Sequence, residues 1–228
     1  MKTVVIIPAY NEQASIGKVI ADIPKEWVHT IIVVDNNSTD NTRLVAEEAG
    51  ARVVFEPIRG YGRACLKGIA SASELHPDVI LFLDGDYSDF PEEIPLLLKP
   101  ILERDVDLVI GSRISGNAEL GALLPQARFG NWLSTRLIQW FWGYRFTDLG
   151  PFRAIRWNSL QALKMEDQTF GWTVEMQVKA AKLKLNTTEV PVSYRKRIGK
   201  SKITGTISGT FKAGYMILYT IFKHFFTK

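Results

Sequence analysis

The chain has 228 residues, of which 46% are hydrophobic, and its formal net charge is +4. This length and hydrophobic content favour one large domain with a single core over two small domains. The only cysteine, Cys65, excludes an internal disulfide, and its apolar neighbours Ala64 and Leu66 predict a buried position. A protein of the reducing cytoplasm is therefore expected.

Apolar, β-branched runs alternate with segments of helical periodicity through the first half of the chain. The first run, residues 3–8, is too short for the apolar core of a signal peptide and predicts a strand. This alternation is typical of a mainly parallel sheet covered by helices, so an α/β fold is expected. In chain order, the predicted strands cover residues 3–8, 30–35, 52–56, 79–84 and 107–112, and the predicted helices cover 13–22, 40–49, 62–75 and 91–104.

Polar residues follow each of the first four predicted strands. In sheets of this kind, the ligand binds beyond the carboxyl ends of the strands. The four groups are therefore expected to meet at one edge of the sheet. They are Tyr10, Asn11 and Glu12 after the first strand, residues 35–40 after the second, Arg59 and Gly60 after the third, and Asp84 and Asp86 after the fourth.

Asp84-Gly85-Asp86 directly follows the apolar run of residues 79–83. Side chains two positions apart in an extended segment lie on the same face. Two carboxylates placed in this way are hard oxygen ligands that suit Mg²⁺ or Mn²⁺ carrying a phosphate substrate. The simpler alternative for an isolated pair is a polar turn after a strand.

The polar stretch of residues 35–42 has two interpretations. Ser38 or Asp40 could cap the following helix, and asparagine-rich turns need no function. Alternatively, the Asp35 carboxylate at a strand end could accept hydrogen bonds from a base or a ribose.

Together with Pro8-Ala9-Tyr10-Asn11-Glu12 and Asp84-Gly85-Asp86, this stretch resembles family 2 glycosyltransferases of the GT-A fold over nearly the whole chain. Many members carry a second Asp where this chain has Asn36, so any contact made there loses its charge. The resemblance implies a metal site for Mg²⁺ or Mn²⁺ at Asp84 and Asp86. It also implies a nucleotide pocket formed by Pro8, Tyr10, Glu12, Asp35, Asn36, Asp84 and Gly85.

Three motifs in the second half are similar to those of polyprenyl-phosphate (dolichol-phosphate) mannosyl- and glucosyltransferases: Gly111-Ser112-Arg113, Phe152-Arg153-Ala154 and Gly199-Lys200-Ser201-Lys202. The resemblance implies a GDP- or UDP-linked sugar donor, a polyprenyl-phosphate acceptor and peripheral contact with the cytoplasmic face of the membrane. Two features depart from the pattern of that group. Gly150-Pro151 interrupts the usual Ser-Gly before Phe152-Arg153-Ala154, and either Arg195 or Arg197 could be the arginine that precedes the last motif. The alternative interpretation of this basic segment is a solvated turn. The implied catalytic set is Asp86, Arg113, Arg195, Arg197 and Lys202.

The acceptor decides whether a general base is needed. A phosphate monoester has a second pKa of about 6 and already offers an anionic oxygen at neutral pH. An alcohol acceptor, soluble or on a glycan, would need a base, for which Asp148, Asp167 and Glu175 are candidates. A sugar-nucleotide-binding module without turnover is a further alternative, against which the intact Asp84 and Asp86 argue.

Two aromatic segments could contact a membrane. The apolar run of residues 213–222 between Lys212 and Lys223 is shorter than the roughly 20 residues that span a bilayer. With the phenylalanines around it, this run predicts either an interfacial amphipathic helix or a helix docked on the domain. The aromatics of residues 132–142 could likewise lie at the headgroups or fill the core. We therefore expect one GT-A domain over residues 1–203 and a C-terminal helix over 204–228 that is not a separate domain.

The three histidines, His29, His76 and His224, lie far apart and lack the spacing of zinc ligands, and His224 is expected at the surface. No pattern typical of a nucleic-acid-binding domain is present, so no nucleic-acid partner is expected.

Overall fold

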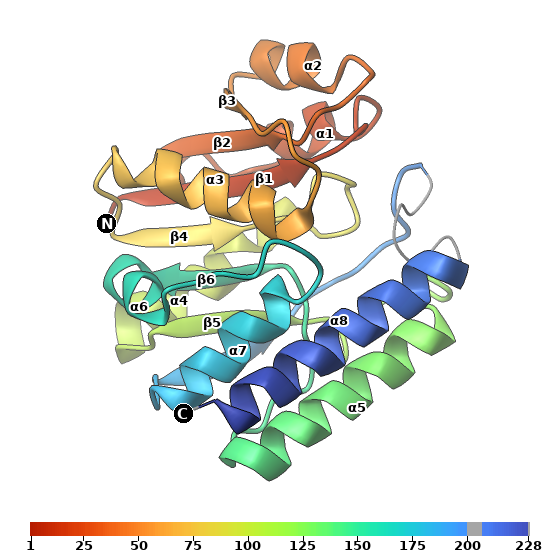
Figure 1. Cartoon of the computed structure of the whole chain (residues 1–228). Helices are drawn as coiled ribbons and strands as arrows, with labels where there is room; N and C mark the ends of the chain where they lie inside the picture. Colours follow the sequence, from red (N-terminus) through yellow and green to blue (C-terminus); the bar gives the residue numbers. More distant parts are fainter. Residues whose placement is uncertain (200–206, 228) are drawn as a thin grey trace.

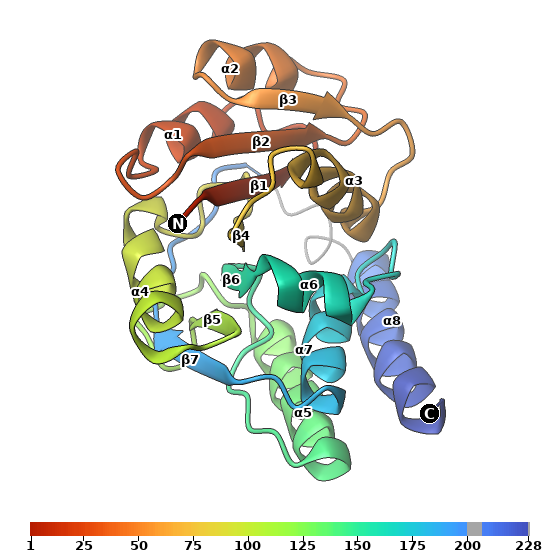
Figure 2. The same cartoon turned by 90° about the vertical axis from the view of Figure 1, so that its left-hand side faces the viewer.

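The computed structural model describes residues 1–199 and 207–227. Within them, a seven-stranded sheet carries helices on both faces (Figures 1 and 2). The strand order is β3-β2-β1-β4-β6-β5-β7. The strands are β1 (Thr3–Ala9), β2 (Thr30–Asp35), β3 (Arg52–Phe55), β4 (Val79–Phe82), β5 (Leu108–Ser112), β6 (Arg153–Arg156) and β7 (Thr187–Pro191).

The helices form two layers. Those on one face of the sheet are α1 (Ile16–Ala21), α2 (Thr42–Glu48) and α4 (Ile94–Arg104), with the short 3₁₀ helix η1 (Pro91–Glu93) before α4. Those on the other side are α3 (Tyr61–Ser73), α5 (Pro125–Trp142), α6 (Trp157–Leu163), α7 (Trp172–Lys182) and α8 (Ile207–Phe226).

The predicted α/β fold with a mainly parallel sheet is confirmed. β1 pairs in parallel with β2 and β4, and only β6 runs antiparallel, between β4 and β5. The strands β6 and β7 were not predicted from the sequence. Charged residues bound the four-residue β6, and in β7 four residues are half-buried and Pro191 is exposed, so neither has the apolar run that identified the other strands.

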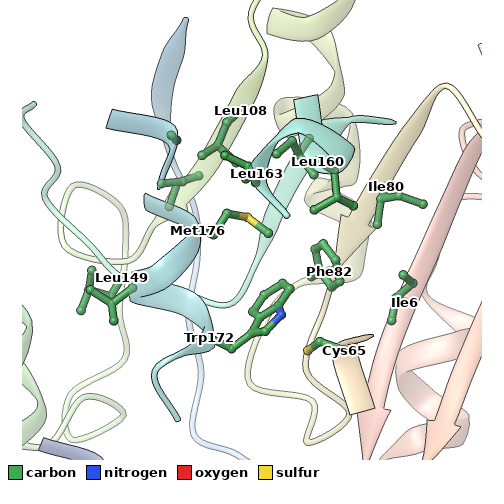
Figure 3. Close-up of a cluster of buried hydrophobic side chains, with 14 of the residues drawn as sticks. Ile6, Cys65, Ile80, Phe82, Leu108, Leu149, Leu160, Leu163, Trp172 and Met176 are labelled. Carbon is green, nitrogen blue, oxygen red and sulfur yellow. The ribbon is translucent and has the colours of Figure 1, made fainter. Parts of the chain in front are cut away.

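Alternating residues of the strands supply two separate cores. Val4 and Ile6 of β1 face α3, whereas Val5 and Ile7 face α1 and α4, as the side-chain period of two in a strand requires. Both faces are covered, which explains why β1 is a continuous apolar run. Figure 3 shows the first core, in which Phe82 packs edge-on against Trp172 with ring centroids 4.6 Å apart. Cys65 is fully buried there, as predicted.

The strand β4 ends two residues earlier than predicted. Leu83 and Asp84 follow as irregular backbone, and a turn continues to Tyr87, whose φ is +65°. Asp86 therefore lies in a turn, and the extended geometry expected between Asp84 and Asp86 is wrong. Hydrogen bonding stabilises this turn, because Asp86 accepts a 2.9 Å bond from the backbone N–H of Ser88.

The C-terminal helix α8 is docked on the domain and also has an exposed aromatic face. Thr220, Ile221 and His224 are buried against the domain, so the expected surface position of His224 is wrong. Tyr215 and Phe226 lie on another side of the helix and are exposed. No helix in the described part of the chain is both long and apolar enough to cross a bilayer.

Candidate active site

A pocket of about 290 Å³ opens at the carboxyl ends of the first four strands. It contains residues from all four of the strand ends at which the sequence predicted polar groups. Its lining includes Pro8 at the end of β1, Tyr10 and Glu12 after β1, Asn36 after β2, Arg59, Gly60 and Tyr61 after β3, and Asp84, Gly85 and Asp86 after β4, together with Phe170 and Arg197.

The outer wall of this pocket is an aromatic ring stacked with a cation. The guanidinium of Arg59 lies 4.2 Å from the ring centroid of Tyr10. Both groups present flat surfaces, and both stack favourably on aromatic rings. This wall is suited to hold a nucleotide base.

Asp35 and Asn36 shape the pocket through the backbone. Asp35 is buried, does not line the pocket, and accepts a 3.0 Å hydrogen bond from the N–H of Ser38. The side-chain amide of Asn36 donates to the carbonyls of Glu56 and Ile58, and its oxygen accepts from the N–H of Gly60 at 2.8 Å. Asn36 therefore fixes the loop that carries Arg59, although it also borders the pocket.

The carboxylates at the pocket floor are bridged by an arginine from a distant part of the chain. The guanidinium of Arg197 donates to Glu12 Oε1 and forms an ion pair with Asp86 Oδ2, both at 3.1 Å. The hydroxyl of Tyr61 donates to Asp84 Oδ1 at 3.0 Å. Burial, and next the nearby charge of Asp86, raise the pKa of Asp84 from 3.8 to about 7. A further positive charge at this floor would favour the ionised form of Asp84.

The donor set fits a hard divalent cation that is shared with a substrate. Within residues 1–199 and 207–227, no three side chains of His, Cys, Asp or Glu converge closely enough to bind one metal ion. Asp84 and Asp86 can supply two carboxylate ligands, which leaves positions for water and phosphate oxygens, as Mg²⁺ prefers. Arg197 already neutralises part of the charge of Asp86, so a metal ion at Asp86 would compete with it.

A second pocket of about 260 Å³ adjoins the first and shares Tyr61, Asp84 and Phe170 with it. Its remaining wall comes mainly from three helices, α5, α7 and α8, which lie together in Figure 1. The lining of this pocket is predominantly apolar. Small residues keep the space open, namely Ala127 and Gly130 on α5 and Ala213 and Gly214 on α8.

Arg113 is the cation of the second pocket, and a buried carboxylate holds it in place. The Nε and Nη2 atoms of Arg113 each donate to Asp148 at 2.7 Å, and the backbone N–H of Arg113 donates to the same carboxylate at 2.8 Å. Asp148 is fully buried, and the N–H of Asp148 donates to Glu189. Such a two-point clamp fixes the plane of the guanidinium and leaves its other edge for an anion.

Other predicted site residues lie elsewhere. Arg195 packs between the rings of Tyr87 and Phe90, with its guanidinium carbon 3.5 and 4.1 Å from their centroids, and it lines neither pocket. The structure thus places Arg197, and not Arg195, at the carboxylates. Lys202 lies outside the described residues.

The candidate bases for an alcohol acceptor are not in the two pockets. Asp148 is occupied by Arg113, and Asp167 accepts from Thr169. Glu175 accepts from the backbone N–H groups of Glu166 and Asp167 and pairs with Lys179 at 2.8 Å. The acidic residues that line the pockets in the described part of the chain are Glu12, Asp84 and Asp86.

Tyr61 and Phe170, which border both pockets, were not predicted as site residues. The loop before α7 carries Phe170 against the start of α3, where the N–H of Gly62 donates to the carbonyl of Thr169 at 3.1 Å. A Cβ atom at Gly62 would lie 2.1 Å from the carbonyl oxygen of Asp167, so this approach requires glycine. The glycines of Gly60-Tyr61-Gly62 after a strand were the sequence signal for a close backbone approach. The loop that approaches them is about a hundred residues away in the sequence, so the local pattern did not identify it.

Comparisons with known proteins agree with this geometry. The model of the family described as glycosyl transferase family 2 matches residues 4–163. An uncharacterised glycosyltransferase of Mycobacterium tuberculosis is 34% identical over 92% of this chain and 93% of the relative. An undecaprenyl-phosphate mannosyltransferase of Micrococcus luteus is 31% identical over 92% of this chain and 90% of the relative's chain.

Among solved structures, the glucosyl-3-phosphoglycerate synthase of Mycobacterium tuberculosis in complex with Mn²⁺, UDP and phosphoglyceric acid superimposes with a TM-score of 0.79. The identity is 22%, and the match covers 100% of this chain and 79% of that chain. At this identity, the similarity demonstrates a shared fold.

Proposed function

Because the chain belongs to glycosyltransferase family 2, we propose that this glycosyltransferase moves a hexose from a nucleoside diphosphate to a polyprenyl phosphate. The reaction would take place at the cytoplasmic face of the membrane with Mg²⁺ or Mn²⁺. The name of the Micrococcus luteus relative, undecaprenyl-phosphate mannosyltransferase, supports this acceptor class.

The single observation that carries the proposal is the pair of joined pockets. One contains the carboxylates at its floor, and the other contains Arg113 together with small and apolar residues of α5 and α8. Asp84 and Tyr61 stand between them, where the sugar of a donor would lie. A substrate with a charged head and an apolar tail matches the second pocket better than a glycan does.

The donor would occupy the first pocket. Its base would stack at Tyr10 and Arg59, with Pro8 beside it and Asp35 behind. Asp84 and Asp86 would hold the metal ion, which neutralises charge on the departing diphosphate. The complex of the glucosyl-3-phosphoglycerate synthase with Mn²⁺ and UDP supports a metal and a nucleotide of this kind. Arg197 would move from Asp86 to the diphosphate when the metal binds.

The acceptor phosphate would lie at Arg113. One of its anionic oxygens would attack the anomeric carbon as the bond from that carbon to the donor diphosphate breaks. No proton has to be removed from this oxygen, which agrees with the positions of Asp148, Asp167 and Glu175 outside both pockets. Arg113, Arg197 and, by resemblance, Lys202 would offset the repulsion between the two phosphate groups.

Peripheral membrane contact is supported by the composition of α5 and α8. Neither helix contains Asp or Glu. Their exposed residues include Trp132 and Trp140 on α5 and Tyr215, Tyr219 and Phe226 on α8, with Lys212 and Lys223 beside them. Aromatic rings with flanking cations are typical of helices that lie at the headgroups.

Incubation with radiolabelled nucleotide sugars tests the proposal. UDP- and GDP-linked glucose and mannose are each offered with polyprenyl phosphate and Mn²⁺, and the products are extracted into organic solvent. One donor should label the lipid fraction, and the Asp86→Asn variant should not. Label that stays in the aqueous phase with every donor, while the donor is consumed, would contradict the lipid acceptor.

A further inference from the structure

A third cavity, the α5 groove, shares Asn131 with the second pocket and no lining residue with the first. It has a volume of about 680 Å³. One wall is a side of α5 that carries Arg128, Trp132, Thr135, Arg136 and Gln139, and the other is the segment of residues 145–147. Asn131 ties this segment to the helix, because its side-chain amide donates to the carbonyl of Thr147 at 2.8 Å.

The α5 groove and the second pocket use different sides of α5. Ala127 and Gly130 face the second pocket, and Phe141 stacks on Phe225 of α8 with ring centroids 4.0 Å apart. At 100° per residue, Trp132 and Arg136 lie well away from that side. A ligand in the α5 groove would therefore not fill the acceptor site.

The lining of the α5 groove is positively charged. Arg128, Arg136 and Arg145 all line it, and its lining contains no Asp or Glu. In the part of the chain that the structure describes, none of the three arginines forms an ion pair, and Arg136 is bonded to Gln139 at 3.3 Å. Glu189 touches the far wall, but its carboxylate is held by Thr147 and Asp148.

Apolar side chains border these cations. Phe129 and Trp132 pack with ring centroids 5.9 Å apart and are 62% and 54% exposed. Trp140 lies on the same exposed side of α5, and its exposed fraction is 73%. Guanidinium groups match phosphate geometry, and tryptophan prefers the boundary between headgroups and acyl chains.

We propose that the α5 groove binds the phosphate headgroup of an anionic phospholipid. Arg128, Arg136 and Arg145 surround the phosphate, while Phe129 and Trp132 enter the boundary with the acyl chains. This inference rests on the proposed membrane contact, and it adds a site for a bulk lipid that is not a substrate. Binding there would orient the mouth of the second pocket toward the bilayer that contains the acceptor.

Vesicle sedimentation tests the α5 groove. The triple variant Arg128→Gln, Arg136→Gln, Arg145→Gln should lose affinity for phosphatidylglycerol-containing vesicles by on the order of 100-fold at low salt. Its affinity for phosphatidylcholine vesicles should stay unchanged. The matched control is Lys67→Gln, Lys99→Gln, Arg104→Gln, which removes the same charge from exposed positions on α3 and α4. An equal loss in both variants would overturn the proposal, because it would reflect net charge alone.

Two further measurements separate the alternatives. Inorganic phosphate that binds at the α5 groove in calorimetry as tightly as the vesicles do would indicate a soluble phosphate ligand and would overturn the lipid assignment. Sugar transfer to a short, water-soluble polyprenyl phosphate should be unchanged in the triple variant. If the proposed acceptor chemistry is wrong, that transfer is absent in every variant, whereas the vesicle result still decides the α5 groove.

Discussion

The two halves of the active site are built in different ways. The donor half is made of strand ends and the turns that follow them, and hydrogen bonds such as those of Asn36 and Tyr61 hold its side chains. The proposed acceptor half is made of α5, α7 and α8, and it is held by apolar packing such as that of Phe141 on Phe225. The proposed donor, which is charged and compact, would thus contact polar groups held by hydrogen bonds, whereas the proposed lipid would contact a wall made of helices.

Arg113 and Arg197 lie in different halves. Arg197 reaches the donor floor from the segment that leads toward α8, and Arg113 reaches the acceptor pocket from the end of β5. Because the two arginines have different partners, Asp86 and Asp148, substitutions can separate donor binding from acceptor binding.

The largest effect is expected on the donor floor. Asp86→Asn removes one charge from the proposed metal site. A bound metal ion stabilises the charge of the transition state by several kcal/mol, so its loss should lower kcat/KM by at least about 10³-fold. The control Glu103→Gln changes the same charge at an exposed position and should leave the rate unaltered. Transfer near the wild-type rate at limiting Mn²⁺ would break the assignment of the metal to this half.

The stability of the donor floor should depend on pH. The raised pKa of Asp84, about 7, means that ionisation of Asp84 disfavours the metal-free fold. The stabilising contribution of neutral Asp84 is fully present below the pKa that Asp84 has in the unfolded chain, and it is lost as pH rises through about 7. Asp84→Asn should therefore stabilise the metal-free protein by on the order of 3 kcal/mol at about pH 8 and by little near pH 4. Urea unfolding at both pH values measures this difference, and an equal change at both would contradict it.

Arg197→Ala should separate metal binding from catalysis. Loss of its charge-assisted hydrogen bonds, worth about 1.5–3 kcal/mol, should lower kcat/KM by roughly 10- to 100-fold. Mn²⁺ binding to the donor-free protein, followed by electron paramagnetic resonance, should become tighter because Asp86 loses a competing cation. Arg195→Ala is the control, since it removes packing at Tyr87 and should lower the melting temperature without changing Mn²⁺ affinity. Weaker Mn²⁺ binding in Arg197→Ala would refute the competition.

The smallest effect is expected on the outer face of α8. Tyr215→Ser with Phe226→Ser should reduce the use of long-chain acceptors in vesicles several-fold, because exposed aromatic area at the membrane is lost. The same variant should keep its melting temperature and its rate with short, soluble acceptors. By contrast, Ile221→Ser on the docked face should destabilise the fold by about 2–4 kcal/mol. Equal losses on both acceptor types would show that the outer face does not meet a membrane.

The same contrast explains what could be predicted from the sequence. The strands β1 to β5 and the polar residues that follow the first four were predicted because each is a local pattern. The turn at Asp84 was predicted as extended, since its positive φ at Tyr87 has no clear signal in a non-glycine residue. The position of Arg195 was left open because stacking on Tyr87 and Phe90 is a tertiary contact.

The acceptor half could be predicted only in outline. The aromatic pattern of residues 211–226 allowed both a docked and an interfacial helix, and α8 uses one side for docking while its other side is exposed. Tyr61 and Phe170 border the same two pockets because Gly60 and Gly62 allow a distant loop to approach. The division of the chain near residue 203 stays a prediction, because residues 200–206 lie outside the described part.

A comparison of polyprenyl phosphate with the matching polyprenol tests whether the acceptor is a phosphorylated lipid. Both are supplied at the same chain length with the donor that the enzyme accepts and with Mn²⁺. The positions of Arg113 and of the candidate bases predict that label enters lipid only with the phosphate, and that the rate changes little above the second phosphate pKa of about 6. Equal transfer to the polyprenol would contradict the account, because it would require a general base at the acceptor oxygen.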